Sequence, residues 1–345
     1  MYELPITDVA IGSTIAAPVY SANGTLLVNE GASVSAQLLK ILPKFGVKTI
    51  KVSEVFKESI DLKILNGKLN NLTYLAIKNS NINDIMRCAN ALVSNVLKDK
   101  KYPLLTLLYD EDESTAKHSF NVACLALNTA IQLGWSLDEV NHIAVAALMH
   151  DIGKLDIPHS ILHKPGKLTE DEYNLVKQHV DYGCKAISAY DNIPTVVREV
   201  ILQHHENHDG TGYPRQLRDY NICKQARLVH IADVYEALCA KRSYKPAIPR
   251  TIVRKIMLDN SGAMFDPILL NKFLNATPLC LLGEELEING RIGIVINVEN
   301  KDNPLISTEH GTMTLENFEN LTDVIIDEYL YNYSVLFKKG GRFRA

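Results

Sequence analysis

The sequence predicts a mainly α protein: a helical-bundle core with a small α+β module before it and a small β-rich extension after it. Through the middle of the chain, apolar residues recur at three- and four-residue spacing, which is typical of amphipathic helices. Short strand-like segments separated by Asn-Gly turns mark both ends. Ten of the eleven histidines fall between residues 118 and 230. We therefore expect the functional site in the helical part of the chain.

The N-terminal α+β module is expected to span residues 1–56. Its expected elements are strands at 14–19 and 26–28, a helix at 33–45 that ends at Gly46, and a strand at 47–52. A helical connector is expected over residues 57–105, where Ile85, Ala89 and Leu92 follow helical spacing. Neither segment carries a concentration of reactive side chains.

The core is expected to span residues 106–275. Its amphipathic helices are predicted at 114–133, 137–149, 170–187, 195–205 and 225–238. The pattern then changes to strands at 286–288 and 291–298, joined by an Asn-Gly turn, within an extension and tail at 276–345. The change of period at both borders predicts separate units.

Composition excludes several classes of protein. The chain has 345 residues, 46% of them hydrophobic and 22% charged, as in ordinary globular proteins of two or three units. A net charge of −4 argues against a binder of duplex nucleic acid or anionic membranes. No apolar run is long enough to span a membrane, and no signal peptide is evident. We expect a cytoplasmic protein, and a homodimer is compatible with these observations.

Two adjacent pairs, His150-Asp151 and His204-His205, indicate a metal site with more than one ion. A lone histidine on an apolar face, such as His118, is more often a core residue than a ligand, but paired ligands in a helical domain rarely arise for packing alone. Seven donors are too many for one tetrahedral zinc, whereas two ions that share Asp151 as a bridge use them all. The candidate ligands, each on a predicted helix or at its end, are His118, His150, Asp151, His179, His204, His205 and Asp233.

Residues from about 106 to 273 resemble the HD-GYP phosphohydrolases, a branch of the HD superfamily. The resemblance is carried by His118, His150-Asp151-Ile152-Gly153-Lys154, Lys164-Pro165-Gly166, His179, His204-His205-Glu206, Asp209-Gly210-Thr211-Gly212-Tyr213-Pro214, Ala232-Asp233 and Phe265-Asp266-Pro267. It implies hydrolysis of the phosphodiester of cyclic di-GMP to linear pGpG, to GMP or to both. It also implies two divalent ions, with iron as the first expectation and manganese as the second, which agrees with mixed imidazole and carboxylate ligation.

The resemblance further implies that four side chains hold the substrate: Lys154, Tyr213, Arg242 and Lys245. Fixed positive groups beside a phosphodiester are physically reasonable, because its non-bridging oxygens carry negative charge. We expect the two metals to acidify a bridging water to hydroxide, with Asp151 and Lys154 as the catalytic side chains. In that mechanism Lys154 balances charge on the equatorial oxygens.

The chain departs from the family pattern at several positions. Ser114 stands where members with a third metal have glutamate, so we expect no third metal. The usual x-Gly-Leu-x-Gly after Gly-Tyr-Pro is replaced by residues 215–219, which lack both glycines, and Glu236 replaces an aspartate. We expect a reshaped loop at 215–219. Two alternatives to the enzyme of cyclic di-GMP therefore stay open: a weakly active or inactive receptor for this nucleotide, and a phosphohydrolase for another nucleotide.

Overall fold

The computed structural model describes residues 2–9, 13–32, 34, 36–53, 82–98, 115–162, 164, 166, 168–239, 248–280, 285–288, 291–298, 300 and 303–319. Contacts between Cα atoms divide the chain into two compact units. We call them the helical unit, whose described residues lie between 82 and 277, and the terminal unit, whose described residues lie before 54 and after 277. Several expectations fall outside the described residues: the helix start at Ser114, the connector at 57–81, the substrate contacts Arg242 and Lys245, and the tail.

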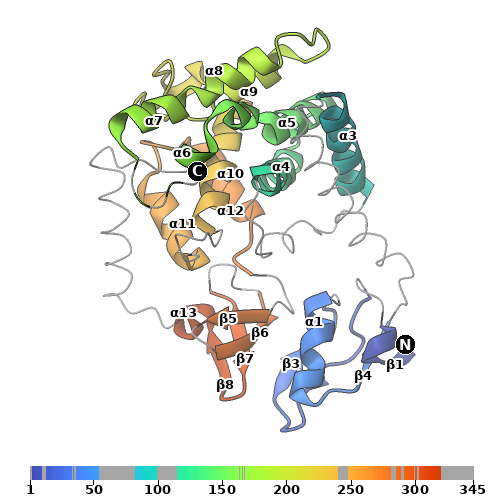
Figure 1. The fold of residues 1–345 in the computed structure, drawn as a ribbon. Helices are drawn as coiled ribbons and strands as arrows, with labels where there is room; N and C mark the ends of the chain where they lie inside the picture. The colour runs from blue at the N-terminus through green and yellow to red at the C-terminus, as the bar shows by residue number, and fades with distance from the viewer. Residues whose placement is uncertain are drawn as a thin grey trace. The chain divides into compact units, whose positions relative to one another are not determined.

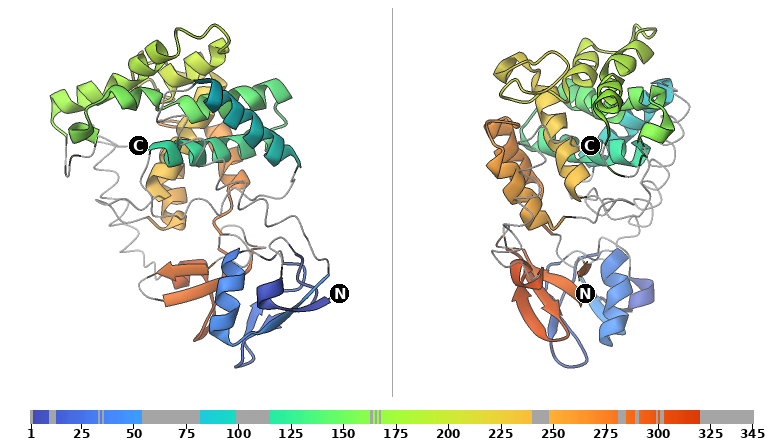
Figure 2. Two further views of the ribbon diagram at one scale, coloured as in Figure 1. Left: turned by 45° about the vertical axis from the view of Figure 1, so that its right-hand side comes forward. Right: turned by 60° about the vertical axis from the view of Figure 1, so that its left-hand side comes forward.

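The helical unit confirms the mainly α prediction (Figures 1 and 2). Its α-helices are α3 (Ile82–Lys98), α4 (Thr115–Gln132), α5 (Leu137–Met149), α6 (His159–Leu162), α7 (Glu170–Lys177), α8 (His179–Ala186), α9 (Thr195–Gln203), α10 (Lys224–Cys239), α11 (Arg250–Asp259) and α12 (Pro267–Ala276). Two 3₁₀ helices, η4 (Ile152–Asp156) and η5 (Asp219–Asn221), lie in connections between them. The helices predicted at 114–133, 137–149, 195–205 and 225–238 correspond to α4, α5, α9 and α10.

Helix α10 runs through the centre of the helical unit, with α4, α9 and α12 around it (Figure 1). Nearly every residue from Gln225 to Leu238 is buried, so this helix has no solvent-facing stripe. A helix that is covered on all sides lies in the core of a bundle. Polar side chains on α10, among them Asp233 and Glu236, are consequently buried and need partners inside the protein.

The ends of several helices are specified by local sequence. At the start of α5, the Ser136 side chain accepts a hydrogen bond from the Glu139 amide, and Glu139 accepts one from the Ser136 amide. Thr169 and Glu172 form the same capping box at the start of α7. Such reciprocal bonds satisfy amides that a helix terminus leaves without partners. Helix α5 therefore begins where the sequence predicts, and its last residue, Met149, is also the predicted one.

The single helix predicted at 170–187 is wrong, because the chain forms α7 and α8 with a break at Gln178. The Gln178 amide donates to the Leu175 carbonyl at 3.0 Å, a tightened turn that ends α7. The break lets η4 lie directly against α8, with Gly153 at the contact. His179 is therefore the first residue of α8 and not a mid-helix residue.

The terminal unit is built from short antiparallel strands. β1 (Tyr2–Pro5) pairs with β4 (Thr49–Val52), and β2 (Val19–Tyr20) pairs with β3 (Leu26–Val28). The helix expected at 33–45 corresponds to α1 (Ala36–Ile41) followed by the 3₁₀ turn η2 (Leu42–Phe45), which ends at Gly46 with φ 79°. Of the strand expected at 14–19, only an isolated bridge at Ile15 and the start of β2 form.

The C-terminal part of the terminal unit is a four-stranded antiparallel sheet in the order β5-β6-β7-β8. β5 (Glu285–Ile288) and β6 (Arg291–Asn297) match the two predicted strands, whereas β7 (Leu305–Thr308), β8 (Gly311–Thr314) and the short helix α13 (Leu315–Phe318) were not predicted. Leu315 and Phe318 are buried against Val295 and Ile306, and this small core is what the sheet covers.

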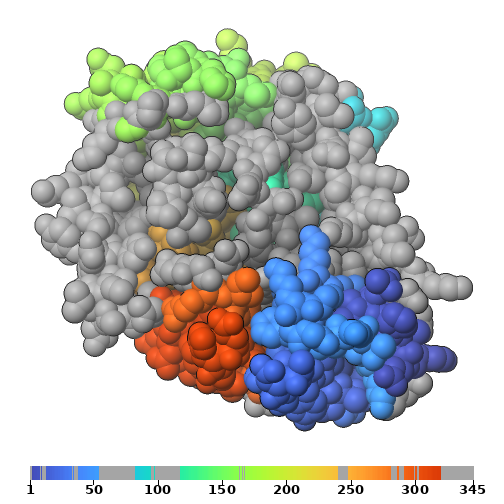
Figure 3. Space-filling model, turned by 60° about the horizontal axis from the view of Figure 1, so that its bottom comes forward, coloured from blue at the N-terminus to red at the C-terminus, as the bar shows by residue number. Residues whose placement is uncertain are grey.

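The two ends of the chain share one hydrophobic core within the terminal unit. Ile294 of β6 is buried in the same cluster as Leu27 and Val28 of β3. The Asn29 side chain also donates a hydrogen bond to the Ile296 carbonyl at 3.1 Å. Figure 3 shows the two segments packed side by side. The boundaries predicted at 56, 105 and 275 stay predictions, but residues of the first module and of the last extension belong to one compact unit.

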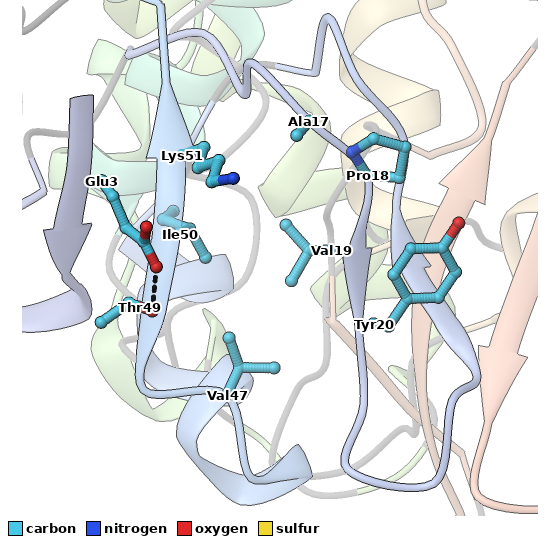
Figure 4. Close-up of a pocket in the computed structure, with 9 residues that line it drawn as sticks. All are labelled: Glu3, Ala17, Pro18, Val19, Tyr20, Val47, Thr49, Ile50 and Lys51. Atoms are coloured by element: carbon cyan, nitrogen blue, oxygen red, sulfur yellow. Dashed lines mark hydrogen bonds between the residues drawn. The ribbon is translucent and has the colours of Figure 1, made fainter. Parts of the chain in front are cut away.

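A shallow groove of about 200 Å³ lies in the terminal unit between β4 and β2 (Figure 4). Val19, Val47 and Ile50 form its apolar part. At one side the Thr49 hydroxyl donates to the Glu3 carboxylate at 3.1 Å. None of the seven candidate metal ligands lines this groove.

Among the described residues, no helix combines the length and apolar character that a membrane crossing needs.

Gly153 yields a testable prediction about the contact between η4 and α8. A Cβ atom at this position would lie 1.9 Å from the His179 carbonyl oxygen and 2.4 Å from the Gly183 amide nitrogen, both of them backbone atoms that cannot move alone. We expect Gly153→Ala to lower the free energy of unfolding by about 3 kcal/mol, the upper end for overpacking. Urea unfolding of the full chain measures this loss.

Gly183→Ala is the matched control for that prediction. Its Cβ atom would lie 2.8 Å from Ile201 Cγ2, a side-chain methyl group that can shift, and alanine favours the helical conformation. We expect a change within about 1 kcal/mol. Equal losses for the two variants would contradict the close-approach explanation.

Candidate metal centre

The seven candidate ligands come from five separate regions of the helical unit. His118 lies within α4, and Asp233 lies within α10. The other five stand at or just beyond helix ends: His150 and Asp151 after α5, His179 at the start of α8, and His204 and His205 after α9. Because the backbone turns at those five positions, side chains from different helices can point to one place.

The structure brings all seven side chains together in two groups. Ligand atoms of Asp151, His179, His204 and His205 lie within 4.8 Å of one another, and so do those of His118, His150 and Asp233. We call these the four-residue group and the three-residue group. The cluster is a candidate site for divalent metal ions, with mixed imidazole and carboxylate donors.

Asp151 lies between the two groups. Its Oδ1 atom is 3.4 Å from His179 Nε2 and 3.7 Å from His204 Nε2. Its Oδ2 atom is 3.4 Å from His150 Nε2 and 3.7 Å from His118 Nε2. One oxygen thus faces each group, which is the geometry that a carboxylate shared by two ions requires.

Hydrogen bonds to the helix backbone set the orientation of three imidazoles. The Nδ1 atoms of His150, His179 and His204 lie 2.7, 2.7 and 2.9 Å from the carbonyl oxygens of Ala147, Val176 and Ile201. A carbonyl only accepts, so each Nδ1 carries the proton and donates it. The lone pair therefore sits on Nε2, the atom that faces Asp151, and the ring cannot turn without losing its bond.

His205 is oriented differently from these three. Its ring stacks on the Tyr213 ring, with centroids 4.8 Å apart and planes inclined by 25°. The Tyr213 amide also donates to the His205 carbonyl at 3.1 Å. Gly212 makes this turn possible, because a Cβ atom there would lie 2.3 Å from the Asn207 amide nitrogen. Tyr213, expected to contact substrate, thus contacts a candidate ligand as well.

Burial and neighbouring charges set the protonation of the metal-free cluster. Burial lowers the pKa of His179 to about 3 and holds that of His205 well below its usual value. Burial alone would raise the pKa of Asp151, but Lys154 and His150 outweigh it and hold this pKa well below the normal range. The rings of His179 and His205 beside an ionised Asp151 are consequently neutral donors, the form that binds metals.

His118 differs from His179 and His205 in its pKa. Burial lowers its pKa, but the carboxylates of Glu236 and Asp233 outweigh burial and raise the pKa to about 9. Its Nδ1 atom lies 2.6 Å from Glu236 Oε2, and its Nε2 atom lies 3.0 Å from Asp233 Oδ1. Within the metal-free protein, His118 therefore carries positive charge between two acids.

Buried polar atoms of the cluster fit a cation between them. His150 Nε2, Asp151 Oδ1 and Asp233 Oδ2 are buried and make no hydrogen bond of acceptable geometry within the described part of the chain. Leaving such atoms without a partner is costly, and native proteins rarely do so outside functional sites. The donor set and its unsatisfied atoms both suit divalent ions.

Lys154 lies directly beside the cluster. Its Nζ atom lies 2.6 Å from Asp151 Oδ2, and 11% of its side chain is exposed. Because η4 turns the chain directly after Asp151, a residue three positions later returns to the same place. The ammonium group is thus close enough to act on a phosphate at the cluster, the role that the resemblance implies.

The loop after Pro214 keeps a conformation suited to glycine although it has none. Gln216 and Asp219 have φ values of 55° and 53°, and they are the two positions where the family pattern has glycine. The buried Glu206 carboxylate holds the loop by accepting from the Arg215 amide at 2.7 Å and the Leu217 amide at 3.1 Å. Burial raises the pKa of Glu206. The loop is thus strained in backbone conformation, and the Glu206 carboxylate is one of the groups that hold it.

Sequence reasoning assigned no role to Glu206, Glu236 or Asn121. Glu206 directly follows the two histidines, and this position was a signal that its carboxylate could contact the loop that comes next in the chain. Glu236 stands three residues after Asp233 and Asn121 three residues after His118, so helical spacing already placed each on the face of a candidate ligand. Which residues on the opposite helix they would meet was not visible in the sequence.

Comparison with known proteins identifies the helical unit. Residues 102–269 match the family model of the HD domain. A solved HDG"Y"P protein from Bdellovibrio bacteriovorus has a TM-score of 0.52 at 18% identity, over 79% of this chain and 97% of that one. At this identity the likeness shows the fold alone. Nearly half of the chain, residues 102–269, is therefore similar to the HD domain.

Curated relatives place the chain more narrowly. A cyclic di-GMP phosphodiesterase of Pseudomonas aeruginosa is 35% identical over 213 residues, which are 61% of this chain and 49% of the relative. A 3'3'-cGAMP-specific phosphodiesterase of Vibrio cholerae is 35% identical over 178 residues, 51% of this chain and 34% of the relative. The chain thus spans about half or less of their length.

The strained loop gives a prediction about stability. A non-glycine residue at positive φ costs roughly 1–2 kcal/mol, so Gln216→Gly should raise the free energy of unfolding by about 0.5–1 kcal/mol after the entropy of glycine in the unfolded chain is subtracted. Asp219→Gly should raise the free energy of unfolding by less, because aspartate tolerates a positive φ better than glutamine does. Urea unfolding of the metal-free chain measures both changes.

Gln216→Ala is the control for the strain explanation. Alanine removes the same side chain but keeps the Cβ atom that opposes positive φ, so no gain is expected. A gain for alanine as large as that for glycine would show that the side chain, and not the backbone, is unfavourable here.

Proposed function

We propose that the chain is a metal-dependent phosphodiesterase that hydrolyses cyclic di-GMP to linear pGpG, to GMP or to both. The observation that carries this proposal is the placement of Asp151, with one carboxylate oxygen toward each of two groups of ligand atoms. Cyclic di-GMP phosphodiesterase is also the activity in the names of several curated relatives.

The four-residue group and the three-residue group would each hold one divalent ion, with Asp151 shared. When bound, such a pair of ions would acidify a water and stabilise the attacking and leaving oxygens of a phosphodiester. Iron is the proposed native metal and manganese the alternative, because imidazole and carboxylate ligands together suit both better than zinc. A third ion is not proposed, since Ser114 offers no carboxylate.

The protein groups have distinct parts in the proposed reaction. The three backbone-bonded imidazoles are held rigidly, so the donors need no rearrangement when the substrate arrives. The Lys154 ammonium would leave Asp151 Oδ2 and contact a non-bridging phosphate oxygen, where its charge opposes the charge that develops in the transition state. Tyr213, Arg242 and Lys245 are the further proposed contacts to the nucleotide.

A second candidate substrate is 3'3'-cGAMP. Curated relatives of comparable identity carry this specificity in their names. The two nucleotides differ in one base and share the phosphodiester ring, so the metal ligands cannot distinguish them. Base contacts outside the metal cluster would decide between them, and the loop at 215–219 is one candidate for such contacts.

A nucleotide panel tests the proposal. We expect the metal-loaded full chain to hydrolyse cyclic di-GMP faster than 3'3'-cGAMP or cyclic di-AMP, with products separated by chromatography. Asp151→Asn should lose more than about 100-fold in activity, beyond the 10–100-fold typical of residues that only orient a ligand. Activity on a generic phosphodiester without any on cyclic di-GMP would contradict the proposal, and preference for 3'3'-cGAMP would favour the second candidate.

Tyr213 has two separable roles that substitution can distinguish. Tyr213→Phe keeps the ring that stacks on His205 and removes the hydroxyl, so metal binding should be unchanged while KM rises about 5-fold, the value of one hydrogen bond. Tyr213→Ala also removes the stack and should weaken Mn²⁺ binding about 10-fold. Mn²⁺ titration and steady-state kinetics measure the two effects. Equal Mn²⁺ affinity of the alanine variant and the wild-type chain would exclude the stacking role.

A further inference from the structure

Helices α4 and α10 interlock through two pairs of polar side chains. On α4, His118 and Asn121 stand three residues apart, and on α10, Asp233 and Glu236 do the same. Residues at this spacing lie on one face of a helix. The His118 ring fits between the two acids, with Nε2 facing Asp233 and Nδ1 facing Glu236.

Both oxygens of Glu236 are engaged in this contact. Oε2 lies 2.6 Å from His118 Nδ1, and Oε1 accepts a hydrogen bond from Asn121 Nδ2 at 3.0 Å. Glu236 and Asn121 are each 4% exposed. A carboxylate so deeply buried is tolerated only when it is paired and hydrogen-bonded. Asn121 therefore fixes the direction in which the carboxylate meets His118.

This arrangement distinguishes His118 from the other candidate ligands. His150, His179 and His204 are held by neutral backbone carbonyls, and His205 is stacked on Tyr213. Within the described part of the chain, His118 is the candidate ligand whose distal nitrogen meets a carboxylate. A charge-assisted hydrogen bond is roughly twice as strong as a neutral one, and a carboxylate partner makes an imidazole a more basic ligand.

We infer that Glu236, held by Asn121, is a positioning residue that aims His118 Nε2 at the three-residue group and selectively strengthens the binding of a divalent ion there. The inference rests on the proposed metal site and adds that its two groups of ligands are supported differently. The three-residue group contributes fewer side chains of its own than the four-residue group, and it is the group that the Glu236 carboxylate supports.

Mn²⁺ binding to the metal-depleted full chain tests this role. We expect the wild-type chain to bind two Mn²⁺ ions that give the paramagnetic resonance signal of a spin-coupled pair. Glu236→Gln keeps the shape of the side chain and removes its charge. The variant should lower the affinity for one of the two Mn²⁺ ions about 10- to 100-fold. At limiting Mn²⁺ the resonance signal should then be that of a single uncoupled ion.

Two further variants separate positioning from general destabilisation. Asn121→Ala removes the second hydrogen bond to Glu236 and should lower the affinity for the same Mn²⁺ ion by a smaller factor. Asp266→Asn alters another buried carboxylate of the helical unit, which pairs with Arg227 and caps α12. It should lower the thermal midpoint and leave Mn²⁺ affinity and spin coupling unchanged.

The outcomes that overturn the inference are distinct. If folded Glu236→Gln binds both Mn²⁺ ions with wild-type affinities, Glu236 has no positioning role. If Asp266→Asn loses Mn²⁺ to the same extent as Glu236→Gln, the effect is one of stability. A wild-type chain that binds no Mn²⁺ pair overturns the proposed metal site and this inference with it, and that failure is seen before any variant is made.

Discussion

A carboxylate buried among imidazoles needs positive charge close to it, and this requirement on Asp151 organises the helical unit. Asp151 is 2% exposed and stands between the two groups of ligand atoms. Lys154 supplies one compensating charge at 2.6 Å, and the protonated His118 supplies another. Divalent ions would supply more, because each would replace weak contacts of 3.4–3.7 Å with direct coordination. Binding energy of this kind adds to the stability of the fold.

The helical unit meets this requirement by ending its helices at the site. Asp151 follows α5, His179 begins α8 and His204 follows α9. The close contact of Gly153 with α8 brings two of these ends together without side chains between them. Helix α10 contributes Asp233 and Glu236 from the centre of the bundle, where their burial makes each depend on a partner from α4. Packing and chemistry thus constrain the same few positions.

The seven candidate ligands, which lie together in the structure, could be selected from the sequence because their signals are local. Adjacent pairs such as His204-His205 need no knowledge of tertiary structure, and helical spacing places His118 on the core face of α4. The break at Gln178 could not be inferred, because the apolar pattern of 170–187 continues through it and the close contact that it allows, with Gly153, involves a distant segment. The pairing of Glu236 with Asn121 joins residues 115 positions apart in the chain, which periodicity cannot reveal. Likewise, positive φ at Gln216 follows from the contacts of Glu206 and not from the local residue type.

The central claim is that Asp151 is shared by two ions. Anomalous X-ray diffraction from crystals of the Mn²⁺-loaded chain tests it most directly, because the method locates each ion without reference to activity. The account predicts two peaks about 3.5–4 Å apart, one among the ligands of the four-residue group and one among those of the three-residue group, with an oxygen of Asp151 on each. A single peak, or two ions of which only one contacts Asp151, would contradict it.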